Sequence, residues 1–326
     1  MKLRIRLRVQ AGPKPRCDRA VTNGATQDSD SGTTNEELDT GAQGAVVSAP
    51  PMLDSSTVLL HYHRDQAGPR TGAAQLDQPE EPDHFTALDG RPVDPTVLER
   101  VLARALELGP AGVAAFDLDS TLLNNKPRQT RIVREAGQLL GEARLFGCVP
   151  DHFINWSLEP PLQKLGFLPA EITQLIPKIR QIWKERFFTS TYCENDVATP
   201  GAVDFLKRIL TAGSVIAYCT GRHEGMRSGT VACLAREGFP VPDAERVHLL
   251  MKPTIEMHDD AFKISARGPL AALGTVFAVF DNEPTHINNF FSHFGSAHCV
   301  HLLTDDSGRG CRPHAQIPSV RDFGLS

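Results

Sequence analysis

The sequence has few aromatic residues and no ordered pattern of cysteines. Of its 326 residues, two are Trp, three are Tyr and sixteen are Phe. Tyr62 is the only aromatic residue among the first 84. The seven cysteines include no C-x-x-C pair. Such an odd, unpatterned set predicts reduced thiols in a cytoplasmic protein.

Long hydrophobic runs and a strong charge of either sign are also missing. No apolar run approaches the length of a membrane span, so we expect no membrane partner. Residues 1–10 alternate Lys and Arg with Leu, Ile and Val and lack the continuous apolar region of a secretory signal. The formal net charge of -5 gives no overall attraction to nucleic acid, although a local basic patch could still provide one.

The first 92 residues differ in composition from the rest. Stretches such as residues 27–44 consist largely of Gly, Thr, Asp, Glu and Ser, with almost nothing to bury. Such a segment cannot offset the entropy cost of ordering, which predicts a disordered extension over residues 1–92. We further predict an α/β core over residues 93–123 and 200–304, a helical insert over residues 124–199 and a C-terminal tail over residues 305–326.

Apolar runs alternate with helical patterns through most of the core. The patterns predict strands at residues 112–116, 215–219, 247–251, 276–280 and 299–303, and helices at residues 200–212, 226–237, 259–273 and 284–294. Because each strand is apolar throughout, we expect a doubly wound parallel sheet with helices on both faces. In such sheets ligands bind beyond the carboxyl ends of the strands.

The segment between residues 123 and 199 interrupts this alternation. It contains no convincing strand, but residues 128–140 and 169–188 have helical patterns. An insert directly after the first strand would roof the carboxyl ends of the strands. We therefore interpret it as a lid that excludes water from a site below it.

Polar residues follow the predicted strands at their carboxyl ends. Asp117 and Asp119 come directly after the first strand, in the run Phe116-Asp117-Leu118-Asp119-Ser120-Thr121. Two carboxylates one residue apart at a strand end suit a hard cation and a phosphate, with one carboxylate free to act as nucleophile. The next three strands end at Thr220-Gly221, Lys252 and Asp281.

In their order, these motifs resemble those of the haloacid dehalogenase-like superfamily, over about residues 110–304. The resemblance comprises the D-x-D-x-T motif of residues 117–121, Thr220, Asp281 and a helical cap after the first motif. It implies a Rossmann-like core. The superfamily's lysine corresponds to Lys263 or to Lys252, and its usual place favours Lys263. In place of a second acidic residue beside or four after Asp281, this chain has Asn282 and Thr285.

The resemblance also implies a chemistry. Asp117 would attack phosphorus to form an aspartyl-phosphate, and Asp119 would act as the general acid and base. Thr220, Gly221 and Lys263 would bind the phosphate oxygens. Mg²⁺ would be held by Asp117, the backbone carbonyl of Asp119, and Asp281. Dehalogenases of the superfamily lack an aspartate at the position of Asp119, so its presence favours a phosphatase.

Three functions follow as hypotheses. The leading one is a Mg²⁺-dependent phosphatase that hydrolyses a small organic phosphate monoester beneath the cap. A polynucleotide 3'-phosphatase is an alternative, because Met251-Lys252-Pro253 and Asp260-Ala261-Phe262-Lys263 resemble the phosphatase half of polynucleotide kinase-phosphatase. The large cap and the acidic net charge count against it. The third is a non-catalytic phosphate-binding module. The sequence predicts neither the substrate nor the oligomeric state.

Overall fold

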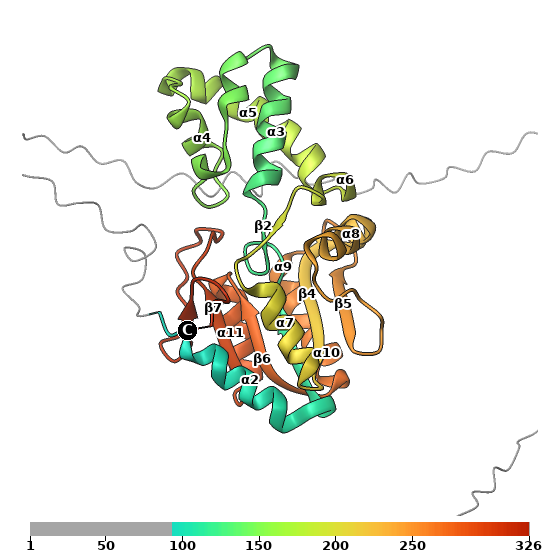
Figure 1. Cartoon of the computed structure of the whole chain (residues 1–326). Helices are drawn as coiled ribbons and strands as arrows, with labels where there is room; N and C mark the ends of the chain where they lie inside the picture. Colours follow the sequence, from blue (N-terminus) through green and yellow to red (C-terminus); the bar gives the residue numbers. More distant parts are fainter. Residues whose placement is uncertain (1–92, 326) are drawn as a thin grey trace, which may run out of the picture. The chain divides into compact units, whose positions relative to one another are not determined.

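The described part of the chain is built on one parallel sheet. The computed structural model describes residues 93–325, so the predicted disordered extension lies outside the described residues. Six parallel strands follow the order β5-β4-β1-β6-β7-β8 (Figure 1). Their bounds are β1 Gly112–Phe116, β4 Val215–His223, β5 Val247–Lys252, β6 Thr275–Asp281, β7 His298–Leu302 and β8 Ser319–Val320.

Helices cover both faces of this sheet. On one face, Ala114 and Phe116 of β1 pack with residues of α2 (Thr96–Leu108), α7 (Ala202–Thr211) and α8 (Arg227–Glu237). On the other face, Val113 and Ala115 pack with residues of α9 (Asp259–Ser265), α10 (Arg267–Leu273) and α11 (Pro284–His293). Successive side chains of a strand point to opposite faces, so an entirely apolar β1 is buried on both sides. The predicted doubly wound fold is confirmed.

Four phenylalanines pack together in the core beside the end of β1. The rings of Phe116 and Phe280 stack with their centroids 4.8 Å apart. Phe205 of α7 and Phe323, near the C-terminus, contact both of these rings at centroid distances of 5.5 to 6.4 Å and lie 5.4 Å from each other. Such aromatic pairs add to the free energy gained by burial. They fix the position of the chain just before Asp117.

The residues inserted between β1 and α7 form a helical cap with a core of its own. Its α-helices are α3 Lys126–Leu140, α4 Glu159–Lys164, α5 Pro169–Phe187 and α6 Ser190–Cys193. Apolar side chains of α3, α4 and α5 share one buried cluster. Two short antiparallel strands, β2 Leu123–Asn124 and β3 Val197–Ala198, carry the chain into and out of the cap (Figure 1).

Some elements differ from the sequence-based expectation. The helix predicted over residues 259–273 is divided at Ala266 into α9 and α10, because Pro269 lacks the amide hydrogen that a continuous helix would need. β2, β3 and β8 were not predicted, since two residues are too few to establish a period of two. β4 also runs on to His223, beyond Thr220.

Shorter elements complete the description. Four 3-10 helices lie at Gly109–Ala111, Ala143–Gly147, Pro150–His152 and Glu224–Met226. In residues 93–325, no helix combines the length and the apolar character needed to cross a membrane.

The aromatic cluster predicts a large effect of one truncation. We expect Phe116→Ala to lower the free energy of unfolding by about 3–5 kcal/mol, because it removes a fully buried ring and leaves a cavity. Leu106→Ala, whose side chain is 70% exposed, should change it by about 0.5 kcal/mol or less. Urea titrations of the two variants measure both values. If Phe116→Ala lowers the free energy of unfolding no more than Leu106→Ala does, the aromatic cluster does not stabilise the fold.

Candidate active site

A buried lysine joins the ends of the two strands at the centre of the sheet. Asp117 follows β1, and Asp281 ends β6, which is hydrogen-bonded to β1. The ammonium of Lys263, from α9, donates to Asp117 Oδ1 at 2.6 Å, to Asp281 Oδ2 at 2.7 Å and to the carbonyl of Cys219 at 2.8 Å. All three N–H groups are therefore used. The structure brings these three predicted residues together.

One ammonium shared by two buried carboxylates leaves a deficit of positive charge. Burial raises the pKa of Asp117 to about 7. The Asp281 carboxylate adds to this effect, and Lys263 opposes it. Although burial works in the other direction, Lys263 and His286 hold the pKa of Asp281 below its usual value. The two carboxylates likewise raise the pKa of Lys263 against the effect of its burial. A further cation beside Asp117 would therefore be stabilised.

Thr220 and Gly221 lie at the end of β4, the other neighbour of β1. The pairing of Phe116 with Tyr218 puts Thr220 level with the chain just past β1. Thr220 is fully buried, and its hydroxyl accepts a hydrogen bond from the amide of Arg222. A side chain at Gly221 would meet the carboxylate of Asp259, because a Cβ there would lie 2.9 Å from its Cγ.

The second candidate lysine has another partner. Lys252, at the end of β5, forms an ion pair with Asp259 at 2.6 Å. Lys263 is thus the lysine in contact with Asp117, whereas Lys252 pairs with Asp259, whose carboxylate lies beside Gly221.

A tight turn carries the chain from Asp117 to Asp119 and on to the cap. Ser120 has a φ of 58°, which is uncommon for a residue with a side chain. The amide of Ser120 donates to the carbonyl of Leu123, and the amide of Leu123 donates to the carbonyl of Leu118. This closed turn leaves Asp119 beside the entrance to the cap.

Asp119 faces two buried arginines. Arg222 donates to both of its carboxylate oxygens, at 2.9 and 2.7 Å, and Arg128 of α3 donates at 3.2 Å. Asn125 donates to the same carboxylate at 2.8 Å. Burial alone would raise the pKa of Asp119, but the two guanidinium groups hold it well below its usual range. Asp119 is therefore ionised in this arrangement.

Sequence reasoning missed the arginines, their second partner and a histidine. Arg222 was visible only as part of the Thr220-Gly221-Arg222 run. Nothing in the sequence of the insert distinguished Arg128, or Asp196, with which both arginines form ion pairs. Such pairs join residues far apart in the chain and leave no local pattern.

The missed histidine lies beside Asp281. Nδ1 of His286 is 3.4 Å from Asp281, and Nε2 is 2.9 Å from Asp260, so the ring lies between two carboxylates. The adjacent Asn282 donates to the carbonyl of Asp305 and accepts from Thr121. Both ends of the Asn282 side chain are thus engaged within the protein. Asp260 is thus a further acidic residue near Asp281, and the ring of His286 lies between their carboxylates.

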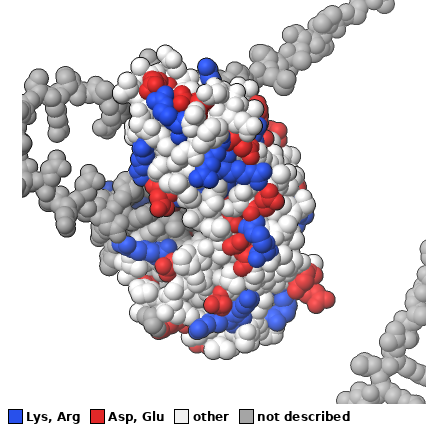
Figure 2. Space-filling model, turned by 45° about the horizontal axis from the view of Figure 1, so that its top comes forward, with Lys and Arg blue, Asp and Glu red and all other residues white. Residues whose placement is uncertain are grey.

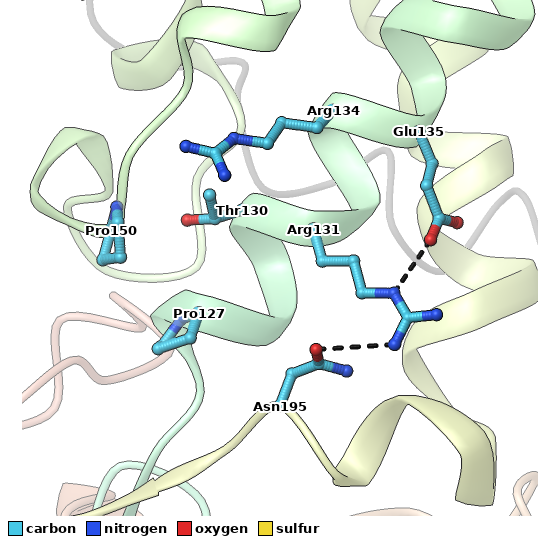
Figure 3. Close-up of a pocket in the computed structure, with 7 residues that line it drawn as sticks. All are labelled: Pro127, Thr130, Arg131, Arg134, Glu135, Pro150 and Asn195. Carbon is cyan, nitrogen blue, oxygen red and sulfur yellow. Dashed lines mark hydrogen bonds and ion pairs between the residues drawn. The ribbon is translucent and has the colours of Figure 1, made fainter.

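Two cavities lie close to these groups without including Asp117. A cavity of about 380 Å³ opens along α3, where Arg131 pairs with Glu135 and Arg134 extends towards Pro150 (Figure 3). A second cavity of about 180 Å³ lies beside β2 and β3. The residues that line it include Ser120, Asn124, Thr199 and Thr304. Asp117 itself is only 8% exposed.

At this edge of the sheet, the side-chain atoms that could bind a metal ion are carboxylate oxygens. In the described residues, no group of three or more His, Cys, Asp or Glu side chains is placed to hold a metal. The side-chain ligands available beside Lys263 are the two carboxylates of Asp117 and Asp281. A pair of carboxylates suits Mg²⁺, which usually retains several waters.

Removal of the Lys263 ammonium tests this arrangement of charges. Lys263→Met leaves Asp117 and Asp281 buried side by side, so we expect it to lower the free energy of unfolding by about 3–5 kcal/mol. Adding Asp281→Asn should restore part of the loss. Lys252→Met is the control and should cost about 1 kcal/mol or less, because the side chain of Asp259 is 48% exposed. Denaturant titrations decide, and equal losses at the two lysines would contradict the expectation.

Comparisons with known proteins found similar structures but no similar sequences. No family model matches the chain, and no curated protein matches it. Its structure is similar to a class C acid phosphatase from Bacillus anthracis, at 19% identity, over 64% of this chain and 66% of that one, with a TM-score of 0.34. It is also similar to a putative haloacid dehalogenase-like hydrolase from Bacteroides fragilis, at 16% identity, over 66% of this chain and 98% of that one, with a TM-score of 0.41.

A third similar structure is a putative phosphatase from Clostridium difficile, at 14% identity, over 61% of this chain and 88% of that one, with a TM-score of 0.41. The similar structures include phosphatases and haloacid dehalogenase-like hydrolases. Any functional conclusion depends on the geometry at the carboxyl edge of the sheet.

Proposed function

We propose that the chain is a haloacid dehalogenase-like phosphatase that hydrolyses phosphate monoesters through an aspartyl-phosphate. The contact of Lys263 with both Asp117 and Asp281, at the carboxyl edge of a parallel sheet, is the observation that carries this proposal. A carboxylate nucleophile, an ammonium and a buried hydroxyl from Thr220 are the groups that phosphoryl transfer needs at one place.

The proposed reaction has two displacement steps. An oxygen of Asp117 attacks phosphorus, the bond from phosphorus to the leaving oxygen breaks, and Asp119 gives its proton to that oxygen. Water then attacks the phosphorus of the aspartyl-phosphate and passes a proton to Asp119. The bond between phosphorus and Asp117 breaks, inorganic phosphate leaves, and both carboxyl groups return to their initial states.

The residues around phosphorus have separate tasks. Lys263, Thr220 and the amide of Gly221 would hold the equatorial oxygens, whose charge shifts in the transition state. Asp117 and Asp281, with the backbone carbonyl of Asp119, would bind Mg²⁺. When bound, the ion offsets the repulsion between an anionic nucleophile and an anionic phosphate, roughly 4 kcal/mol at 4 Å in a partly polar site.

Asp119 must take up a proton before the first step. Its contacts with Arg222 and Arg128 keep it ionised in this structure. A phosphate group bound nearby brings negative charge, which favours the neutral form of a carboxyl group. The ionised form that Arg222 and Arg128 favour is the one that accepts a proton from water in the second step.

A small organic phosphate is the substrate class that we favour. On the face of the described residues seen in Figure 2, Lys and Arg side chains alternate with Asp and Glu, and no continuous basic stripe crosses it. Such a stripe is typical of proteins that follow a nucleic-acid backbone. A cytoplasmic location, as predicted from the cysteines, fits a metabolite substrate.

Removal of the nucleophile tests the proposed activity. We expect Asp117→Asn to reduce hydrolysis of para-nitrophenyl phosphate to below about one thousandth of the wild-type rate, since an amide cannot form the aspartyl-phosphate. Asp151→Asn, which changes an exposed carboxylate on the cap, should retain wild-type activity. Full activity of Asp117→Asn would show that another group attacks phosphorus.

Metal removal and a substrate panel test the finer parts. EDTA should abolish turnover, and added Mg²⁺ should restore it. A panel of phosphorylated metabolites and a 3'-phosphorylated oligonucleotide should show turnover of small compounds only. Turnover of the oligonucleotide alone would favour a 3'-phosphatase. Binding of inorganic phosphate without turnover of any compound would favour a non-catalytic phosphate-binding module.

A further inference from the structure

Four charged side chains meet at the junction of the cap and the core. We call Asp119, Arg128, Asp196 and Arg222 the hinge network. Besides its contacts with Asp119, Arg222 donates to Asp196 at 2.6 Å. Arg128 donates from Nε to Asp196 at 2.8 Å, and its terminal nitrogen contacts both Asp196 and Asp119. Each arginine therefore contacts each aspartate.

The hinge network is buried and electrically balanced. The side chains of Arg128 and Asp196 have no exposed surface, that of Arg222 is 1% exposed, and only that of Asp119 reaches 20%. Two positive and two negative charges cancel. A buried set of this kind is rigid while it is complete, because the loss of one member leaves a charge without a partner.

The members come from both sides of the junction. Asp119 and Arg222 belong to the core, at the ends of β1 and β4. Arg128 lies in the first turn of α3, and Asp196 directly precedes β3, so both lie where the chain passes between cap and core. Arg128 is also tied to the cap, because it donates to the carbonyl of Phe187 and lies over that ring.

A close contact beside the network holds the cap against the core. The hydroxyl of Ser190, in α6, donates to the carbonyl of Gly225 and accepts from the amide of Gly229, in α8. A Cβ at Gly229 would lie 2.0 Å from the carbonyl oxygen of Ser190, so no larger residue fits while the cap is docked. The next residue, Thr230, accepts a hydrogen bond from Arg222.

We propose that Arg128 and Asp196 are positioning residues that fix the carboxyl group of Asp119 towards the leaving group only while the cap is docked. This inference rests on the phosphatase function proposed above. With the cap docked, Asp119 has three partners from two directions: Arg222 of the core, and Asn125 and Arg128 at the start of the cap. When the cap moves away, Arg128 and Asp196 move with it, and Arg222 alone remains. Proton transfer to the leaving group is thereby restricted to the closed enzyme.

Two substrates that differ in their leaving group provide the test. Nitrophenolate leaves with little help from an acid, whereas phenolate needs a proton more. We expect Arg128→Met and Asp196→Asn to lower kcat/KM for phenyl phosphate by about 100-fold, the usual effect of losing general acid catalysis, and for para-nitrophenyl phosphate by much less. The inhibition constant of inorganic phosphate should stay close to the wild-type value, because these residues do not hold the phosphate.

Further variants separate positioning from folding. Arg128→Lys keeps the charge and should recover part of the loss. Gly229→Ala should give the same preference for the nitrophenyl substrate, because it displaces the cap while all four side chains of the hinge network remain unchanged in sequence. Arg131→Gln is the matched control on α3, since Arg131 pairs with Glu135 and Glu194 outside the network, and should behave as the wild type.

The outcomes distinguish this inference from the proposed function. Equal fold losses of kcat/KM on the two substrates, which leave their ratio unchanged, would overturn the positioning role. A change confined to the inhibition constant of phosphate would overturn it as well. Absence of turnover of both substrates by the wild type would instead overturn the phosphatase function, and full activity of Asp117→Asn would overturn only the assigned nucleophile. If Arg128→Met or Asp196→Asn fails to fold by circular dichroism, Arg128→Lys and Gly229→Ala still decide through the leaving-group ratio.

Discussion

The structure around the site depends on a single ammonium held between two carboxylates. Lys263 lies at the meeting point of β1, β4 and β6, where Asp117, Asp281 and the carbonyl of Cys219 accept its three hydrogen bonds. Without that cation, two aspartates could not be buried together at the centre of a sheet. Burial is the main cause of the raised pKa of Asp117, and the Asp281 carboxylate adds to it against the effect of Lys263.

Asp117 and Asp119, two residues apart, lie in opposite electrostatic surroundings. Asp117 shares one cation with another carboxylate, while Asp119 faces two guanidinium groups. The turn at Ser120 makes this possible, because it directs the chain out of the sheet immediately after β1. The two carboxyl groups of one short motif therefore ionise over different ranges of pH, Asp117 at a raised pKa and Asp119 at a lowered one.

The cap is connected to this chemistry through charge as well as through covalent linkers. β2 and β3 pair only over two residues each, so they restrain the cap weakly on their own. The balanced contacts of Arg128 and Asp196 with Arg222 add a rigid connection at the same place. A cap joined in this way can cover the site and orient Asp119 in a single movement.

The sequence by itself determined the alternating elements, the doubly wound sheet and the residues at its carboxyl edge. Apolar runs of strand length and helical periods are local properties, and the motif at residues 117–121 is contiguous. The usual place of the superfamily's lysine favoured Lys263 over Lys252, and the tertiary structure added that Lys263 contacts Asp117 whereas Lys252 contacts Asp259. The tertiary structure also revealed Arg128 and Asp196, because an ion pair between residues far apart in the chain follows from packing and leaves no periodic trace in the sequence. His286 is close to Asp281 in the chain, but only the fold puts its ring between Asp281 and Asp260.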